Sequence, residues 1–251
     1  MILVLKSAGR KEKEDNKVGK NKLSKWAEME NWEFVLQPGL DEVFGKDYRL
    51  KGKWKSDFFK NDNPLVLELG CGKGEYTTGL AMLFPEKNFI GIDIKGARMW
   101  LGARTTFNHG LKNVAFLRTR IEFIRSFFSP AEADEIWITF PDPQIKKRRA
   151  KKRLTSPLFL NAYRTFLSPG GIVHLKTDNR QLYDYTLKVL EHNHLKVNVA
   201  TDNLYESDVE GEILSIKTHY EKLFLQKGTP ITYIQFEINN ELDPVLPEEE
   251  E

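Results

Sequence analysis

Cysteine is almost absent from the sequence: Cys71 is the only one in 251 residues. One thiol cannot form a disulfide within the chain, which excludes a disulfide-stabilised secreted scaffold and fits a reducing compartment. We therefore expect a cytoplasmic protein. Cys71 itself stands where a small residue is needed, and we interpret it as a packing residue.

Long apolar runs are missing as well. No segment approaches the roughly 18 consecutive apolar residues that a membrane-spanning helix needs. The first five residues are apolar, but the basic residues follow them, which is the reverse of the order in a signal peptide. A soluble protein without a membrane partner is expected.

A large net charge is also lacking, because 38 basic and 36 acidic residues leave a formal charge of +2. The charges are unevenly placed, however. Residues 6–25 contain eight basic and three acidic side chains, and residues 248–251 are all glutamates. We expect a basic, partly disordered N-terminal arm and lead-in over 1–50, a folded domain over 51–240 and an acidic tail over 241–251. The arm is either a solvated tail or a segment that orders on RNA.

Short apolar segments alternate with helical ones between these ends. Strands are predicted over 65–69, 88–94, 114–118, 135–140, 172–177, 195–200 and 232–238. Helices are predicted over 75–84, 97–108, 121–128, 157–167 and 180–193. Alternation of near-continuous apolar strands with helices is typical of a parallel sheet covered on both faces. We predict an α/β fold with a doubly wound, mostly parallel seven-stranded sheet, helices on both faces, and an antiparallel last strand at one edge.

A glycine loop follows the first predicted strand, with Gly70, Gly72 and Gly74 between that strand and a helix. Glycine lets the chain turn sharply and brings backbone close to a ligand, and the helix that follows offers unpaired N–H groups. A dinucleotide fingerprint has the spacing G-x-G-x-x-G, but position 75 is Glu75. The loop therefore indicates a ligand site of another kind.

Two carboxylates flank this loop. Glu68 lies in the strand before it, where an acid would repel a pyrophosphate but suits a ligand with a cationic amino group. Asp93 ends the second predicted strand, where a carboxylate can accept hydrogen bonds from both ribose hydroxyls of a nucleoside. S-adenosylmethionine has that amino group and lacks phosphate, so it is the expected cofactor. The alternatives are a buried, paired Glu68 and an Asp93 that caps the next helix.

A rigid turn follows the fourth predicted strand, in the order Phe140-Pro141-Asp142-Pro143. The two prolines restrict the backbone around Asp142. Ligands of open α/β sheets bind at the carboxyl ends of the strands, where this turn lies. Asp142 is therefore a candidate catalytic residue. The alternative is an aspartate that only forms the turn.

Seven of the eight residues over 146–153 are basic, and none is acidic. Like charges at this density repel unless an anion neutralises them, and nucleic acid is the natural partner. A solvated surface is the alternative. Asp178 ends the fifth predicted strand at the same edge of the sheet. Residues 218–221 have, by themselves, the pattern of an ordinary amphipathic helix turn.

Together these motifs resemble the bacterial tRNA (guanine-N7)-methyltransferase family over nearly the whole chain from about Gly52. The motifs agree in order and spacing, and they are Gly52-Lys53-Trp54, Asn61-Asp62-Asn63-Pro64, the 68–74 loop, Asp93, the Pro-Asp-Pro turn with its basic run, Leu154-Thr155, Phe159-Leu160, Lys176-Thr177-Asp178-Asn179-Arg180 and Thr-x-Tyr-Glu at 218–221.

The resemblance implies a Rossmann-like fold and methyl transfer from S-adenosylmethionine to N7 of guanine 46 in the variable loop of tRNA. It implies cofactor contacts at the loop and strand ends, namely at Glu68, Gly70, Gly72, Gly74, Asp93, position 120 and Asp142. It gives Asp142 the catalytic role and implies substrate contacts at Lys146, Asp178, Thr218, His219, Tyr220 and Glu221. We accordingly expect tRNA as the partner, no metal, and a monomer or a homodimer.

Two positions depart from the family pattern. Position 120 usually carries an acid or amide that meets the adenine, but Arg120 has no acceptor atom, so the contact falls to backbone or to Thr119. After the Pro-Asp-Pro turn, Gln144-Ile145 replaces the common Trp-Pro, which removes aromatic or proline support near the base.

The chemistry expected at this site needs no general base, since N7 of guanine has a free lone pair and no proton. Positioning and electrostatics should then supply the rate, and Asp142 would orient the purine and stabilise its developing positive charge.

Other functions compete with this interpretation. A methyltransferase for DNA adenine would carry Asp/Asn-Pro-Pro-aromatic where this chain has Phe-Pro-Asp-Pro, and another RNA or a protein as the substrate is a further alternative. A non-catalytic RNA-binding module with a nucleoside pocket is disfavoured by the intact Glu68, Asp93 and Asp142, and a dehydrogenase by the glycine spacing. Methyl transfer from labelled cofactor to bulk tRNA separates enzyme from binding module.

Overall fold

The computed structural model describes residues 23–209 and 211–238. Residues 6–22 of the basic arm and the acidic tail lie outside the described residues, so the expectations for them stay predictions.

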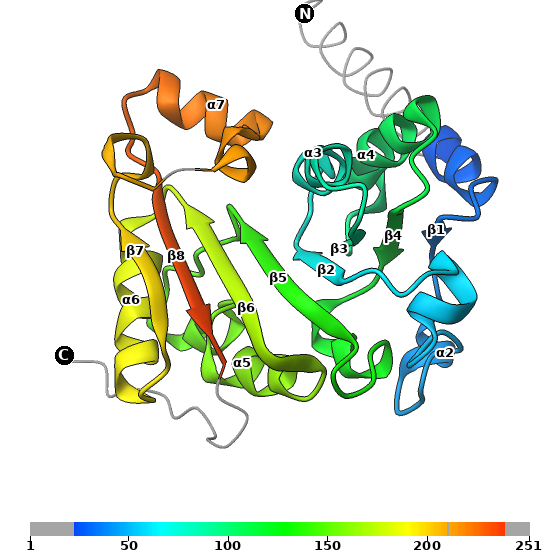
Figure 1. The fold of residues 1–251 in the computed structure, drawn as a ribbon, viewed down its shortest axis with the longest axis horizontal. Helices are drawn as coiled ribbons and strands as arrows, with labels where there is room; N and C mark the ends of the chain where they lie inside the picture. Colours follow the sequence, from blue (N-terminus) through cyan, green and yellow to red (C-terminus); the bar gives the residue numbers. More distant parts are fainter. Residues whose placement is uncertain (1–22, 210, 239–251) are drawn as a thin grey trace, which may run out of the picture.

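One eight-stranded sheet forms the centre of the fold (Figure 1), in the order β1-β4-β3-β2-β5-β6-β8-β7. The strands are β1 (Val35–Leu36), β2 (Leu65–Leu69), β3 (Asn88–Asp93), β4 (Val114–Arg118), β5 (Ala133–Thr139), β6 (Leu167–Thr177), β7 (Val197–Thr201) and β8 (Thr232–Glu237). All neighbours from β1 to β6 are parallel, whereas β8 is antiparallel to both β6 and β7. The predicted mostly parallel sheet with an antiparallel last strand is confirmed.

Two details of the sheet differ from the prediction. The additional strand β1 has only two residues, too few to show a periodic pattern. The last strand, β8, lies between β6 and β7 instead of at the edge. Its residues are mostly buried, as suits an interior strand, while the residues of β7 are partly or fully exposed, as suits an edge strand.

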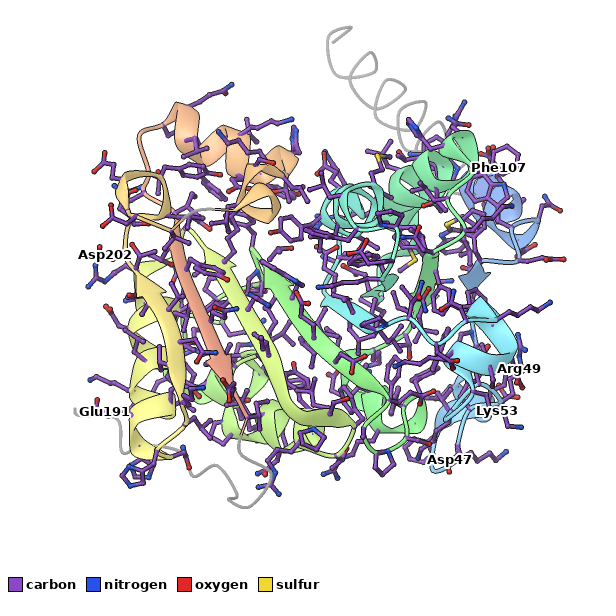
Figure 2. All side chains as sticks on the ribbon, in the orientation of Figure 1. Asp47, Arg49, Lys53, Phe107, Glu191 and Asp202 are labelled. Carbon is purple, nitrogen blue, oxygen red and sulfur yellow. The ribbon has the colours of Figure 1, made fainter. Side chains whose placement is uncertain are left out.

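Helices cover both faces of the sheet. On one face, α3 (Glu75–Leu83) and α4 (Gly96–His109) share a hydrophobic cluster with alternate strand residues such as Val66 and Phe116. On the other face, α5 (Pro157–Arg164) and α6 (Arg180–His192) pack with the 3-10 helix η2 (Ile121–Ser126), which replaces the helix predicted over 121–128. Figure 2 shows Glu191 on the outer surface of α6. The doubly wound arrangement is confirmed.

The hydrophobic core extends past the predicted boundary at residue 51. Residues 23–30 are helical, and Met29 and Trp32 belong to the cluster on the α3 and α4 face. The short helix α2 (Leu40–Val43) and the π-helix η1 (Trp54–Phe59) close the opposite cluster through Val43 and Trp54. The lead-in is therefore part of the fold, because its apolar residues find partners that are distant in sequence.

The chain reverses its winding direction at β2 and β5. From β2 it proceeds outward through β3 and β4, and it then returns to add β5 and β6 on the other side of β2. At such a switch point, the loops that follow the two neighbouring strands run in opposite directions. This leaves a crevice at the carboxyl ends of the strands. The glycine loop follows β2 and the Pro-Asp-Pro turn follows β5, so both candidate motifs meet at this crevice.

Candidate functional site

The three loop glycines all have left-handed backbone, with φ of 77° at Gly70, 54° at Gly72 and 69° at Gly74. A Cβ at Gly70 or Gly72 would meet only ordinary van der Waals contacts, at 3.8 Å from Leu154 and 3.9 Å from the Gly70 carbonyl, and both residues line the crevice. Gly74 has another role, because a Cβ there would lie 2.6 Å from the Phe116 ring. Gly74 thus permits close packing of the loop on the sheet, and it does not line the crevice.

Glu68 is buried beneath the glycine loop, with 3% of its surface exposed. Its carboxylate accepts hydrogen bonds from the Thr77 N–H at 2.8 Å, from the Thr139 hydroxyl at 2.6 Å and from the Thr77 hydroxyl. Burial raises the pKa of Glu68 to about 7, with a smaller contribution from the charge of Asp93, against the hydrogen bonds that lower it. Glu68 is therefore buried and paired, as the alternative interpretation expects, and it still lines the crevice.

Asp93 stands half-exposed at the end of β3. One carboxylate oxygen accepts the Gly72 N–H at 2.9 Å, and the other accepts the Lys95 N–H at 2.7 Å. These bonds fix the carboxylate against the glycine loop. Each oxygen has a further lone pair that can accept a ligand hydroxyl.

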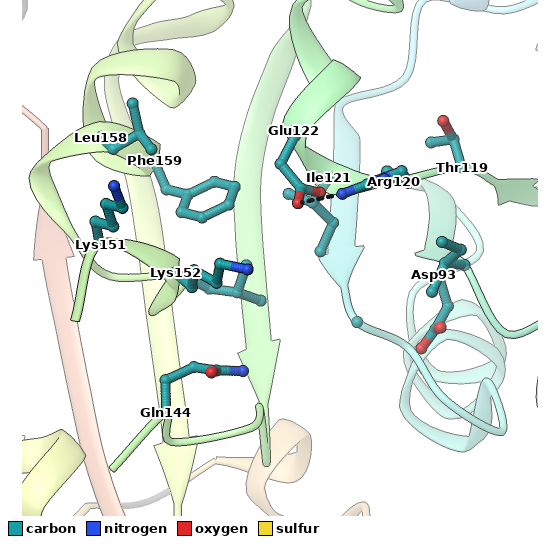
Figure 3. Close-up of a pocket in the computed structure, with 13 residues that line it drawn as sticks. Asp93, Thr119, Arg120, Ile121, Glu122, Gln144, Lys151, Lys152, Leu158 and Phe159 are labelled. Atoms are coloured by element: carbon teal, nitrogen blue, oxygen red, sulfur yellow. Dashed lines mark hydrogen bonds and ion pairs between the residues drawn. The ribbon is translucent and has the colours of Figure 1, made fainter. Parts of the chain in front are cut away.

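The crevice contains two adjoining chambers. The polar chamber, about 360 Å³, is lined among others by Glu68, Gly70, Gly72, Asp93, Asp142, Thr218 and Tyr220. The apolar chamber, about 480 Å³, has walls of Ile94, Ile121, Leu154, Leu158 and Phe159, and Thr119 and Arg120 also line it. Figure 3 shows Phe159 and Lys152 on one side of the apolar chamber and Arg120 and Asp93 on the other. Asp93 and Gly70 line both chambers and so connect them.

The Pro-Asp-Pro turn is held in a strained conformation. Phe140 and Gln144, on either side of it, have φ of 48° and 46°, which is unfavourable for residues with a side chain. The exposed Asp142 accepts the Gln144 N–H at 3.1 Å and lines the polar chamber. Asp142 therefore both forms the turn and faces the crevice.

Arg153 supports this turn from inside the protein. It is 7% exposed, its Nε donates to the Pro143 carbonyl at 3.2 Å, and its guanidinium lies 4.1 Å from the centre of the Tyr185 ring. The sequence pattern groups Arg153 with the cations that face RNA. That grouping is wrong, because a side chain buried in this way is not available to a polyanion.

The remainder of the basic run forms the 3-10 helix η3 (Lys147–Lys152) beside the crevice. Its cations are exposed, and Lys151 and Lys152 line the apolar chamber. Lys146 is exposed and lines neither chamber. The run thus adjoins the crevice, as the sequence predicts.

Glu122 is a residue of the apolar chamber that the sequence does not reveal. The Arg120 guanidinium lies 3.2 Å from the Glu122 carboxylate, and both residues line the chamber (Figure 3). Burial raises the pKa of Glu122, but its own backbone N–H and Arg120 outweigh that effect, so the net pKa is lowered. The cation at position 120 therefore accompanies an anionic acceptor two residues later.

The segment over 218–221 begins α7 (His219–Gln226) and contributes two of its residues to the crevice. Thr218 caps the helix, and Thr218 and Tyr220 line the polar chamber. His219 is exposed and lines neither chamber. Glu221 is fully buried, so in this arrangement it cannot contact a ligand in the crevice.

Asp178 lies after β6, half-buried and lining neither chamber, and burial raises its pKa. The structure also brings further cations to the crevice, and no sequence motif marks two of them. Lys73, Lys95 and Arg98 line the polar chamber together with Lys152. Lys73 and Lys152 lie in motifs, whereas Lys95 and Arg98 lie in none, so spacing could not have found those two.

Comparison with known proteins decides the family. Residues 62–234 match the model of a family described as putative methyltransferase. A tRNA (guanine-N(7)-)-methyltransferase of Bacteroides thetaiotaomicron is 52% identical over 224 residues, which cover 89% of this chain and 88% of that protein. The chain belongs to the tRNA (guanine-N(7)-)-methyltransferase family. The resemblance seen in the sequence is thereby confirmed, and the dehydrogenase alternative is excluded.

Another family member, from Porphyromonas gingivalis, is 57% identical over 190 residues, covering 75% of this chain and 77% of that protein. Among solved structures, the 16S rRNA methyltransferase KamB matches with a TM-score of 0.55 at 14% identity, over 70% of this chain and 88% of that one. At that identity the likeness concerns the fold alone, and it confirms a Rossmann-like methyltransferase fold.

Metal-binding clusters and membrane-spanning helices are both absent from the described residues. Within 23–209 and 211–238, no group of three or more His, Cys, Asp or Glu residues could hold a metal ion. Over the same residues, every helix is too short or too polar to cross a bilayer. The oligomeric state, the compartment and the absence of a metal stay predictions.

Proposed function

We propose that this chain transfers a methyl group from S-adenosylmethionine to N7 of a guanine in tRNA, at position 46 of the variable loop. The observation that carries the proposal is that Asp93 and Asp142 line one chamber, which Lys152 and the exposed cations of η3 adjoin. The relatives are tRNA (guanine-N(7)-)-methyltransferases, which supports tRNA as the substrate and guanine N7 as the target.

The apolar chamber fits the nucleoside part of the cofactor. Asp93 would accept the two ribose hydroxyls with its remaining lone pairs. The aliphatic side chains of Ile94, Ile121 and Leu154 would then contact the faces of the adenine. Glu122 would accept the adenine amine, taking the role that the family pattern gives to position 120.

The polar chamber fits the amino-acid part. The buried charge of Glu68 favours a cationic amino group nearby, and binding such a cation favours the ionised form of a carboxyl whose pKa is about 7. When bound, the cofactor supplies a methyl group on a cationic sulfur. N7 would form the new carbon–nitrogen bond as the carbon–sulfur bond breaks, and the electron pair of that bond would stay on sulfur.

The guanine would occupy the part of the polar chamber between Asp142 and Tyr220. Asp142 would accept N–H groups of the base and stabilise the positive charge that the purine gains, without removing a proton. The Thr218 hydroxyl accepts the Glu221 N–H at 3.2 Å, so its own proton can be donated to the base. The exposed cations over 146–152 would hold the RNA backbone without reading its sequence.

The experiment that tests this function combines methyl mapping with one substitution. Unmodified tRNA is incubated with labelled S-adenosylmethionine, and the methylated base is located by strand cleavage at 7-methylguanine. We expect the label at guanine 46 and a turnover about 100-fold lower for Asp142→Asn at saturating tRNA. Label on another base would contradict the target, and unchanged turnover would remove the role of Asp142.

A further inference from the structure

A buried ion pair lies behind the wall that α7 contributes to the crevice. Lys176 Nζ is 2.7 Å from the Glu221 carboxylate, and both side chains have 0% exposure. The same carboxylate oxygen accepts the Tyr205 hydroxyl at 2.6 Å. Charges buried this deeply need partners, because losing one partner leaves the other desolvated and unpaired. Neither residue lines the chambers, so the proposed chemistry uses neither directly.

The two partners belong to elements that are distant in sequence. Lys176 is the penultimate residue of β6, and Asp178 follows it two residues later. Glu221 lies in the first turn of α7, 45 positions along the chain from Lys176 by their numbers. The pair therefore fixes the beginning of α7 to the end of a central strand.

Glu221 also organises the residues that face the crevice. Its second carboxylate oxygen accepts the Thr218 N–H at 3.3 Å, and its own N–H donates to the Thr218 hydroxyl at 3.2 Å. This reciprocal arrangement sets the direction of Thr218 and the start of the helix that carries Tyr220. A separate bond from the His219 N–H to Glu75, at 2.9 Å, anchors the same turn to α3.

We propose that Lys176 and Glu221 are positioning residues that hold Thr218 and Tyr220 in the wall of the guanine site, and that Glu221 does not touch the tRNA. The proposal rests on the proposed function. The family resemblance implies that Glu221 contacts the substrate, and the proposal replaces that contact with a positioning role. It also gives a physical reason why the 176–180 and 218–221 motifs occur together: one supplies the cation and the other the anion of a single buried pair.

A double-mutant cycle of Lys176→Met and Glu221→Gln tests the pair. Each single substitution leaves one buried charge without its partner, whereas the double variant has no charge at either position. The new amide oxygen at position 221 can still accept a hydrogen bond from the Thr218 N–H. We expect each single variant to raise the KM for tRNA about 10-fold while the KM for S-adenosylmethionine stays nearly unchanged. The double variant should recover most of the loss. Lys196→Met, which breaks the exposed pair with Glu237, is the control that should change neither KM.

Two other patterns would overturn the proposal. If Glu221 touches tRNA through its charge, Glu221→Gln and the double variant will be equally defective, and Lys176→Met alone will be close to wild type. If the pair serves stability only, folded variants will keep the wild-type KM for tRNA and differ only in Tm.

Amide hydrogen exchange provides a readout that does not depend on activity. In each single variant, exchange over 216–224 should be about 10-fold faster than in wild type, and in the double variant it should return toward wild type. Unchanged exchange in all variants would overturn the positioning role. A wild-type protein that fails to methylate guanine would instead contradict the proposed function, and the exchange data would still decide whether the pair orders this turn.

Discussion

At the scale of single residues, Glu68 and Asp93 occupy different surroundings although both are carboxylates on adjacent strands. Asp93 is half-exposed and accepts two backbone N–H groups, which leaves a further lone pair on each carboxylate oxygen. Glu68 is buried, and three donors from Thr77 and Thr139 surround it. Under the proposed function, the two acids would therefore bind different ends of the cofactor, a hydroxyl-bearing sugar and a cationic amine.

The raised pKa of Glu68 predicts a pH-dependent stability. Between about pH 4.5 and 7 the folded protein keeps a proton on Glu68 that the unfolded chain releases, so stability is lost as the pH rises through this window. The shift corresponds to about 3 kcal/mol. The Glu68→Gln variant lacks this titrating group, so its stability does not depend on pH in this way. The free energy of unfolding of the variant, relative to that of wild type, should therefore increase by about that amount when the pH is raised from about 5 to about 8.

Denaturant unfolding of the cofactor-free protein at the two pH values checks this expectation. Glu86→Gln, at an exposed position, is the control that should show no such change. A difference between Glu68→Gln and wild type that is the same at both pH values would contradict it.

Glu122 predicts how the protein distinguishes adenine from a deaminated base. A carboxylate accepts from the adenine amine but repels the oxo group that replaces it, whereas an amide can donate to that group. Wild type should bind S-adenosylhomocysteine at least about 10-fold more tightly than S-inosylhomocysteine, and Glu122→Gln should largely remove the preference. Calorimetric titration of both ligands measures this directly. Undiminished preference in Glu122→Gln would exclude Glu122 as the acceptor.

At the scale of elements, the turn after β5 and the basic run form one structure. Two residues with unfavourable φ, at a cost of about 1 to 3 kcal/mol each, flank Asp142. The run that follows returns Arg153 to donate to the carbonyls of Pro143 and Gln144. One end of the run thus maintains the strained turn, while its exposed part faces solvent beside the crevice.

The exposed cations of η3 predict the salt dependence of tRNA binding. Arg148 and Arg149 are exposed and line neither chamber, so they can contact phosphates without touching the cofactor. Arg148→Ala with Arg149→Ala should weaken tRNA binding and reduce the slope of log K against log salt by about 1 to 2. Cofactor affinity should be unchanged. Lys188→Ala, on the surface of α6, is the control. If this double variant lost cofactor affinity as strongly as tRNA affinity, the basic run would have a structural role instead.

At the scale of the whole molecule, periodicity and strand-end rules predict the parallel sheet and bring Glu68, Asp93 and Asp142 to one crevice. They succeed because apolar strands and glycine loops are local signals. Whether a charged side chain is buried, in contrast, depends on residues that are distant in the sequence. Arg153 and Glu221 each depend on partners from other elements, so the sequence could not show that they point inward. The role of Glu122 likewise emerges only when Arg120 is seen beside it.

The central claim is that one crevice brings a methyl donor to N7 of a guanine held by tRNA. Single-turnover methyl transfer to tRNA with either guanine or 7-deazaguanine at position 46 tests it most directly, because 7-deazaguanine has carbon in place of N7. We predict complete transfer to the guanine tRNA and none to the 7-deaza tRNA, with both tRNAs binding equally well. Equal transfer to the two tRNAs would contradict the claim.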